Sequence, residues 1–392
     1  MLVGREFTIL GAGISGLALA RALAMHGARV TVLEQSPELG EVGAGIQISP
    51  NGMKVLDALG LGTELAATSP RLKAVELLNG ETGEPVTRLD MAMRRPNAPY
   101  YFVRRPELIA LLAGGARDAG VEIRLDQRIE AVEITDDGPV LTFEGGATSR
   151  PGTVLGADGL HSKLRGALNG EVKPFFTNQV AWRAMVPMPR AEPPVARVFM
   201  GAKKHIVSYP LSNGMRNIVA VEERSRWAEE GWHIRDDAMT LRVAFEEFCP
   251  EVRGWLEQVE DPYLWGLFRH PVARRWFGPN CAILGDAAHP TLPFLAQGAN
   301  MALEDAWILA QALALHGEDE VGFAAYQTAR RERSSEIVEA ANKNARNYHL
   351  SGLPRVVGHL GMRALSKFAP DLLIGKYDWI YNYDARTILQ TD

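Results

Sequence analysis

Cysteine is scarce in this sequence, which has only Cys249 and Cys281 among its 392 residues. Two cysteines cannot build a disulfide framework, and neither lies at a metal-ligand spacing, so we expect no bound metal. A basic surplus is also missing, because 42 Lys and Arg stand against 47 Asp and Glu, a formal net charge of −5. Nucleic acid and anionic membrane surfaces are therefore not expected partners.

Long hydrophobic runs are absent too. No uncharged apolar stretch reaches ~18 residues, so we expect no transmembrane helix. Residues 7–20, apolar and followed by small residues at 22–24, imitate a secretory signal peptide. The glycines of this run follow a fixed pattern, however, and a second apolar strand comes after it, neither of which a signal peptide needs. We interpret the start of the chain as folded structure and expect a cytoplasmic protein.

The chain has instead an ordinary globular composition, 46% hydrophobic and 23% charged, and enough length for two domains. Residues 7–10, 14–26 and 29–33 have the patterns of a buried strand, a packed helix and a β-branched strand, which make a βαβ unit. Turn pairs at 137–138 and 213–214 predict hairpins. Further strands are predicted at 72–78, 85–89, 121–125, 129–135, 140–143, 181–186, 196–200, 205–211 and 217–221, and helices at 108–118, 238–248 and from 297 onward.

A glycine motif lies between the first strand and the first helix. Gly11, Gly13 and Gly16 have the spacing G-x-G-x-x-G, which permits a tight turn, close approach of backbone N–H groups to a pyrophosphate, and close helix–strand packing. The helix N-terminus then faces the phosphate charge. Glu34 lies at the end of the second strand, where a carboxylate can accept hydrogen bonds from ribose hydroxyls. The motif predicts a bound dinucleotide and leaves NAD and FAD both open.

Two later segments have the same design, a strand that ends at an acidic residue. Residues 153–162 form a strand that leads into Asp158-Gly159, and residues 282–290 form a strand that leads into Gly285-Asp286. Each motif places a carboxylate at the carboxyl end of a strand, where open α/β sheets bind ligands. A plain NAD dehydrogenase needs neither of them.

Taken in order, these three motifs resemble those of the class A FAD-dependent aromatic monooxygenases, which have the para-hydroxybenzoate hydroxylase-like fold. Residues 204–211 and 217–221 are most similar to the salicylate hydroxylase-like branch. The resemblance implies an α/β fold in which a FAD-binding Rossmann-like domain carries an inserted, mostly antiparallel β-sheet substrate domain and ends in C-terminal helices. The expected FAD-binding domain is residues 1–72, 99–175 and 266–340, the substrate domain 73–98 and 176–265, and the C-terminal helical segment 341–392.

The resemblance also implies roles for single residues. The glycine motif would hold the FAD pyrophosphate, Glu34 the adenosine ribose and Asp286 the ribityl chain. Arg105 would reach the flavin side of the cofactor, and Asp158 is associated with both FAD and NAD(P)H. Residues 293–300 would wrap the isoalloxazine ring. The expected cofactor-binding residues are Gly11, Gly13, Ser15, Gly16, Glu34, Arg105, Asp158, Asp286, Pro293, Gly298, Ala299 and Asn300.

A helix is predicted to begin at the end of this wrapping segment. Residues 302–313 carry an apolar stripe at helical spacing, so the helix starts near residues 298–300 with its first N–H groups unbonded. Those donors suit the negative charge that a reduced flavin places on its N1–C2 edge. Glu304 and Asp305 are expected in the first turn, where they would complement the helix dipole. Farther on, the arginines at 330–333 lie in a mixed-charge helix and are interpreted as a solvated face.

The strand at residues 205–211 is the candidate substrate-binding strand. Alternation places His205 and Tyr209 on the same face, ~13 Å apart. A histidine near its normal pKa suits removal of a phenol proton, so we predict His205 as the catalytic base and Tyr209 as a group that positions the substrate. A structural histidine bonded to a neighbouring carbonyl stays open as the alternative for His205, and core packing as the alternative for Tyr209.

Three further residues are candidate substrate contacts: Gln47, Pro293 and Arg183. Gln47 is expected to face the pocket in this branch of the family. Arg183 would pair either with a substrate carboxylate or, as a salt bridge, with the other domain.

The function that the resemblance implies is a FAD-dependent monooxygenase that uses NADH or NADPH and O2. It would hydroxylate a small phenolic or N-heteroaromatic acid through a flavin C4a-hydroperoxide. One alternative is a same-fold epoxidase or hydroxylase of a larger lipophilic substrate, a quinone precursor or polyketide, in which Trp379, Tyr381 and Tyr383 touch a membrane or partner. Another is a non-catalytic nucleotide-binding regulator. A homodimer is also left open.

Overall fold

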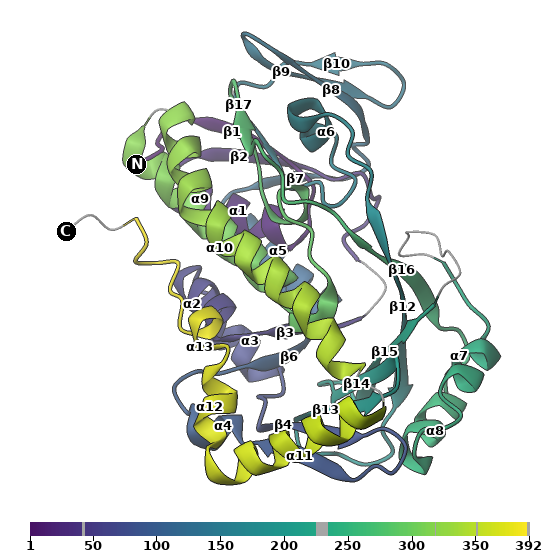
Figure 1. The fold of residues 1–392 in the computed structure, drawn as a ribbon. Coiled ribbons are helices and arrows are strands. Elements are labelled where there is room, and N and C mark those ends of the chain that lie inside the picture. Colours follow the sequence, from purple (N-terminus) through teal and green to yellow (C-terminus); the bar gives the residue numbers. More distant parts are fainter. Residues whose placement is uncertain (41–43, 225–233, 318, 350–351, 390–392) are drawn as a thin grey trace.

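The computed structural model describes residues 1–40, 44–224, 234–317, 319–349 and 352–389 (Figure 1). A mostly parallel sheet carries the glycine motif and the two acidic motifs. Because β1 pairs in parallel with β2 and β11, and β11 with β18, the carboxyl ends of these strands meet at one edge. Across the sheet the strands are β17 (Phe277–Gly278), β18 (Cys281–Ile283), β11 (Val154–Gly156), β1 (Glu6–Leu10), β2 (Arg29–Leu33) and β7 (Glu122–Arg124).

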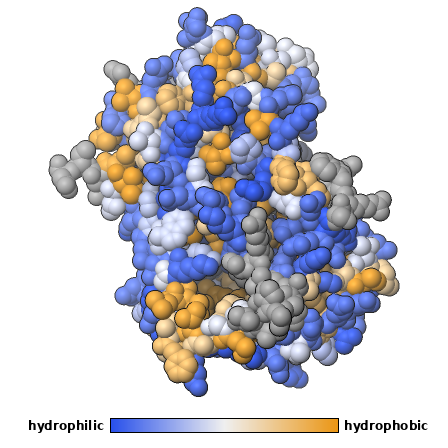
Figure 2. Space-filling view, viewed as in Figure 1, coloured by the Kyte–Doolittle hydropathy of each residue, from blue (hydrophilic) through white to orange (hydrophobic). Residues whose placement is uncertain are grey.

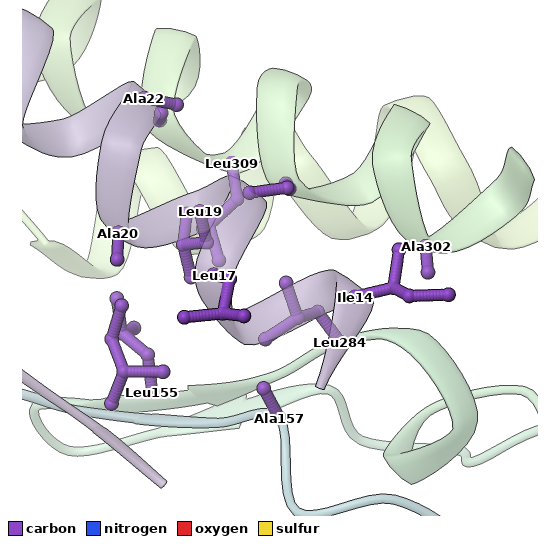
Figure 3. Close-up of a cluster of buried hydrophobic side chains, with 14 of the residues drawn as sticks. Ile14, Leu17, Leu19, Ala20, Ala22, Leu155, Ala157, Leu284, Ala302 and Leu309 are labelled. Atoms are coloured by element: carbon purple, nitrogen blue, oxygen red, sulfur yellow. The ribbon is translucent and has the colours of Figure 1, made fainter. Parts of the chain in front are cut away.

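The first helix is held between this sheet and a long helix from late in the chain. Figure 3 shows α1 (Ile14–Met25), whose side chains share one buried cluster with Leu155 of β11 and Leu309 of α9 (Gly298–His316). Most of α1 is buried, and a fully buried leucine contributes about 1.5–3 kcal/mol. The packing therefore fixes the N-terminus of α1 at the edge of the sheet where the motifs meet.

A second sheet of seven strands is antiparallel except for its β13–β4 pair. Alternation along its strands behaves as predicted: Ile206 packs against the outer helices, whereas His205 and Tyr209 lie on the opposite face. The outer helices are α7 (Ala238–Ala244) and α8 (Pro250–Glu257). In order, the strands are β16 (Tyr263–Arg269), β12 (Phe175–Pro187), β15 (Met215–Glu223), β14 (Lys204–Pro210), β13 (Val195–Gly201), β4 (Ala74–Asn79) and β5 (Pro85–Leu89).

Smaller elements connect and flank the two sheets. A three-stranded sheet and a two-stranded sheet complete the strands, and both predicted hairpin turns are present. The helix predicted over residues 238–248 is instead α7 followed by α8, which begins at a proline after a break. The remaining elements are β3 (Gly45–Ile48), β6 (Tyr101–Arg104), β8 (Ile129–Thr135), β9 (Gly138–Phe143), β10 (Thr148–Ser149), α2 (Pro50–Ala58), α3 (Gly62–Thr68), α4 (Met91–Arg94), α5 (Arg105–Asp118) and α6 (Lys163–Asn169).

The last part of the chain returns to the centre of the molecule. In Figure 1, α10 (Asp319–Tyr348) runs beside α9, and the yellow helix α11 (Gly352–Phe368) lies along the lower edge. From there α12 (Pro370–Gly375) and α13 (Asp378–Tyr381) turn up the left side, where α13 contacts α2. Figure 2 shows apolar side chains gathered where α11 and α12 reach the surface, and the exposed ones include Phe368 and Leu372. Among the described residues, no helix is long and apolar enough to cross a bilayer.

The arginines of α10 correct one prediction. Arg330 and Arg333 are buried rather than solvated, and only Arg331 is exposed. Arg330 lies 2.6 Å from Glu304 and 2.7 Å from Asp305, and Arg333 lies 2.8 Å from Glu304.

The two acidic residues correct a second prediction. Glu304 and Asp305 lie in the second turn of α9, not the first, so they do not lie beside the unbonded N–H groups at the helix start. Their carboxylates instead pair with the arginines of α10. The mixed-charge pattern therefore marks an internal ion-pair network.

The fold class is confirmed: an α/β sheet that carries the dinucleotide motif, a mostly antiparallel sheet inserted into it, and helices at the C-terminus. The residue boundaries of the three domains stay a prediction.

Candidate functional site

A large cavity of about 1140 Å³ lies between the motif-bearing edge of the parallel sheet and the inner face of the seven-stranded sheet. Ligand pockets are typically about 300–1,000 Å³, so this one has room for a large ligand and a small one together. Nearly all the predicted site residues line it. They are Gly11, Gly13, Ser15, Glu34, Gln47, Arg105, Asp158, Arg183, His205, Tyr209, Asp286, Pro293, Gly298 and Ala299.

The glycine motif forms a cradle at one end of the cavity. Gly11 has a φ of +98°, and a Cβ there would lie 2.5 Å from the Ala157 carbonyl oxygen. A Cβ on Gly16 would collide with the Gly11 carbonyl oxygen, so this glycine permits the close helix–strand contact even though it does not line the cavity. Gly13 has open space on its Cβ side. Each glycine therefore meets the requirement of a pyrophosphate loop.

Glu34 is held beside the cradle by backbone donors. Its carboxylate accepts hydrogen bonds from the Ala12 N–H at 2.7 Å and the Ser36 N–H at 2.9 Å. The side chain also lines the cavity, so the structure brings it to the position predicted for a ribose contact.

Replacing Gly16 with alanine is expected to abolish FAD retention, because the new methyl group forces the β1–α1 turn apart. The flavin absorbance of the purified protein measures this. Gly114→Ala in α5 is the matched control, since its Cβ meets nothing within 4 Å and alanine favours a helix by about 0.5–1 kcal/mol. A Gly16→Ala protein that keeps a full complement of FAD would contradict the assignment of the cradle.

The two acidic motifs reach the middle of the cavity. One carboxylate oxygen of Asp158 accepts from the Lys163 N–H at 2.9 Å, while its Oδ1 is buried without a hydrogen-bond partner. Burial raises the pKa of Asp158, and desolvation likewise raises the pKa of Asp286. A ligand that donates a hydrogen bond from a hydroxyl or amide group would satisfy the unpaired Oδ1 of Asp158.

The loop before α9 lines the cavity next to these acids. Ala296 adopts a left-handed conformation, and the Met301 N–H makes a helical bond to the Gln297 carbonyl, so the amides of residues 298–300 precede the first bonded turn. These amides are in the predicted position.

The Asn300 side chain departs from its prediction. It bonds to the Ser49 N–H and to the carbonyls of Gln47 and Ala296, and it does not line the cavity. Because its amide group already makes these bonds inside the protein, the Asn300 side chain ties α9 to β3 and is not placed to bind a ligand.

The far end of the cavity lies against the seven-stranded sheet. Tyr209 stacks on Phe102 with ring centroids 4.6 Å apart, and burial raises its pKa, so its hydroxyl stays protonated. The guanidinium of Arg183 lies over the Trp265 ring at 4.3 Å. Among the described residues, Arg183 is the one lysine or arginine that this sheet contributes to the cavity.

His205 lies on the wall at this end of the cavity, which we call the chamber. It is 2% exposed, and burial, together with neighbouring His349, lowers its pKa well below the usual value. Its Nδ1 lies 2.7 Å from the Nε2 of His349, at the end of α10. No motif marks His349, so the sequence analysis missed it.

The C-terminal helices supply a wall of the cavity that the sequence analysis also missed. Tyr381, which the larger-substrate alternative placed at a membrane or partner, lines the cavity and makes an edge contact with Tyr100 at 6.1 Å. Tyr383 lies under Arg333 at 3.6 Å. The other lining residues from this segment are Gly358, Met362, Leu373, Ile374, Lys376 and Tyr377.

Gln297 belongs to the segment that the resemblance places around the isoalloxazine ring. It is buried, it lines the cavity, and its side chain bonds to Asn51 at 3.1 Å and Ser49 at 3.1 Å.

Across the described parts of the chain, no group of three or more His, Cys, Asp or Glu side chains is placed to hold a metal ion.

The geometry fits FAD. The cradle accepts a pyrophosphate, Glu34 and the orphan Asp158 oxygen accept hydrogen bonds, and the start of α9 offers amides to a flavin ring. The cavity is also larger than a nucleotide alone requires.

Comparisons with known proteins agree with this geometry. The model of the family described as FAD binding domain matches residues 6–341. The chain is 32% identical to the 3-amino-4-hydroxybenzoate 2-monooxygenase of Streptomyces platensis, over 98% of this chain and 97% of that protein. It is 32% identical, with the same coverage, to the 3-hydroxybenzoate 6-hydroxylase of Polaromonas naphthalenivorans. The structure of a salicylate hydroxylase in a substrate complex has the same fold, with a TM-score of 0.81, 22% identity, and coverage of 99% of this chain and 98% of that one. The chain therefore belongs to the FAD binding domain family, among the class A FAD-dependent aromatic monooxygenases, enzymes whose co-substrates are NAD(P)H and O2.

Proposed function

We propose that this enzyme hydroxylates a small phenolic or N-heteroaromatic acid bound between the flavin loop and the seven-stranded sheet. The observation that carries the proposal is the position of His205, a buried histidine on the cavity wall with His349 2.7 Å behind it. Burial lowers the pKa of His205 instead of leaving it near its ordinary value, so the ring is neutral near pH 7. A neutral imidazole can take a phenol proton, and a phenolate ring is electron-rich enough for electrophilic hydroxylation.

The chamber wall supports an aromatic ligand. Apolar side chains of β13, β14 and β15 line the cavity together with His205, and they offer an apolar surface to a ring. Arg183 adds one positive charge to this wall, and Tyr209 lies on the same strand as His205. The apolar lining residues are Ala196, Val198, Val207, Val219 and Val221.

Bound FAD, once reduced by NAD(P)H, would supply the electrons that activate O2, and the transferred oxygen atom would come from O2. The residues of the chain position the FAD and the aromatic substrate. Gly298 and Ala299 line the cavity at the start of α9, and Pro293 and Phe294 line it just before them. The apolar wall excludes water, which protects a reactive flavin from side reactions.

The test is NADH and NADPH oxidation by the FAD-loaded enzyme with a panel of hydroxybenzoates and hydroxypyridine carboxylates, with O2 and product mass followed together. Oxidation that one compound stimulates, with a product heavier by one oxygen, is the expected result. If only a large lipophilic phenol stimulates oxidation, the larger-substrate alternative replaces this proposal. A protein that no aromatic compound stimulates would contradict both.

Replacing Arg183 with methionine is expected to raise the KM for a hydroxy acid about 10- to 100-fold, because a hydrogen bond to a charged group contributes about 1.5–3 kcal/mol. The KM for the matching phenol without its carboxylate should change little. Arg197→Met is the control, since this arginine of β13 pairs with Glu76 away from the cavity. An equal loss for acid and phenol would show that Arg183 acts through packing on Trp265, not through charge.

The homodimer, the domain boundaries and the cytoplasmic location remain predictions. Light scattering of the purified enzyme tests the first of them.

A further inference from the structure

We propose that His349 and Glu223 form a relay that sets the tautomer of His205 and carries the substrate proton from the buried chamber to the surface. The inference rests on the proposed function for its substrate. Its geometry does not depend on that substrate.

Three side chains, from β14, from β15 and from the residue that follows α10, make a continuous hydrogen-bonded line. His205 Nδ1 lies 2.7 Å from His349 Nε2, and His349 Nδ1 lies 2.8 Å from Glu223 Oε1. The exposed fractions of the side chains rise only at the last member: the His349 side chain is 2% exposed, and that of Glu223 is 38%. The line therefore begins at the cavity wall and ends in solvent.

The hydrogen bonds select one tautomer at each histidine. A carboxylate only accepts, so His349 must donate from Nδ1 to Glu223, which leaves His349 Nε2 as an acceptor. His205 must then donate from Nδ1, and its Nε2 carries the lone pair. His205 lines the cavity, and we infer that the substrate phenol approaches this ring on its Nε2 side.

The proton balance follows from the same geometry. The phenol O–H bond breaks and a bond from that hydrogen to His205 Nε2 forms. His205 then passes its Nδ1 proton to His349 Nε2, and His349 passes its Nδ1 proton to Glu223 Oε1, which releases it to water. One proton leaves the site, the substrate remains as phenolate, and nothing is oxidised or reduced.

The charged side chains of Lys204 and Glu222, on the same two strands, have partners outside this hydrogen-bonded line. On the strands packed around it, Lys204 donates to the Ala244 carbonyl and lies 3.8 Å from Glu247, and Glu222 pairs with Arg224 at 2.7 Å. The Phe294 ring lies 6.0 Å from the His205 ring. A proton taken up by His205 therefore has a polar route through His349 to Glu223.

The first test needs no substrate. Nuclear magnetic resonance of the enzyme labelled with 15N-histidine reports which ring nitrogen carries hydrogen, and His205→Asn and His349→Gln assign the two signals. We expect both rings to be neutral at pH 7.5 with hydrogen on Nδ1. A His205 ring with its hydrogen on Nε2 would overturn the relay even if the enzyme hydroxylates phenols.

The second test measures proton release with a pH indicator in stopped flow when a hydroxybenzoate binds the FAD-loaded enzyme. His349→Gln and Glu223→Gln should slow release and phenolate formation about tenfold or more below the pKa of the phenol, with little effect above it. Glu222→Gln removes a neighbouring carboxylate of the same strand and should release protons at the wild-type rate.

The outcomes separate the two proposals. Relay variants that retain FAD and bind substrate, yet release protons at the wild-type rate with the wild-type pH profile, would overturn the relay and leave the proposed function standing. A wild-type enzyme that releases no proton with any phenolic acid would overturn the proposed function and the relay's part in it. The tautomers measured without substrate identify which of the two failed.

Discussion

Replacing His205 with asparagine is expected to slow hydroxylation about 10²- to 10⁴-fold below the pKa of the substrate phenol, the usual contribution of a general base. In activation free energy this is about 3–5 kcal/mol. Above the phenol pKa the substrate enters as phenolate and needs no base, so the variant should approach the wild-type rate. Turnover measured from below to above that pKa checks the prediction.

The control for this variant is the flavin content, which should be unchanged because the glycine cradle lies at the other end of the cavity. A rate that is low at every pH would instead indicate lost positioning. A wild-type rate below the phenol pKa would remove His205 from the chemistry altogether.

The same residue predicts how stability depends on pH. Burial lowers the pKa of His205 well below the unfolded value of about 6.5, so between these two values the unfolded chain binds more protons than the folded chain. Stability is therefore retained above pH 6.5 and is lost as the pH falls toward the folded pKa. Denaturant unfolding of wild type and His205→Asn at pH 7.5 and 5.5 should show a smaller acid loss in the variant.

Replacing Arg330 with methionine is expected to lower the free energy of unfolding by about 3–5 kcal/mol, the effect of leaving a buried charge without its partner. Glu304 and Asp305 are both 0% exposed and both contact this arginine. Burial alone would raise the pKa of Asp305, but His289 and Arg330 beside it lower that pKa to about 2, so its carboxylate is charged in the folded enzyme. Urea unfolding at neutral pH measures the change.

The neighbouring arginine gives a matched control. Arg331 is exposed on the same helix, and Arg331→Met should change the free energy of unfolding by less than about 0.5 kcal/mol. Asp305 also accepts from the Gly285 N–H at 2.9 Å, so Arg330→Met should weaken FAD retention as well. A loss of stability no larger than that of Arg331→Met would contradict the buried network.

Much of the cofactor end was predictable because its requirements are local. A strand, a turn and a helix start follow one another in the chain at each motif, and backbone sterics restrict residues such as Gly11 to glycine. The α/β fold follows from those motifs and from the alternation of β14. The side of the sheet that His205 faces followed from the same alternation.

The rest depended on partners far away in the sequence. His205 and His349 are 144 residues apart, and no pattern in either segment points to the other. Arg330 and Arg333 have the spacing of any charged helix face, and only the burial of α9 on several sides makes that face internal. The C-terminal wall of the cavity carries no motif, since apolar residues such as Ile374 are common in every core.

The order of the strands has a consequence for how the enzyme is made. The ribosome delivers β1 and the glycine cradle first, but their sheet neighbour β18 and the covering helix α9 leave the exit tunnel only late in synthesis. The nascent βαβ unit therefore waits with much of its apolar surface uncovered, a period in which chaperones can bind it. FAD can be captured only once β18 and α9 are in place, and the helices that finish the cavity emerge after them. Cofactor loading is thus late relative to synthesis of the glycine cradle, and the supply of flavin acts only after α9 has been made.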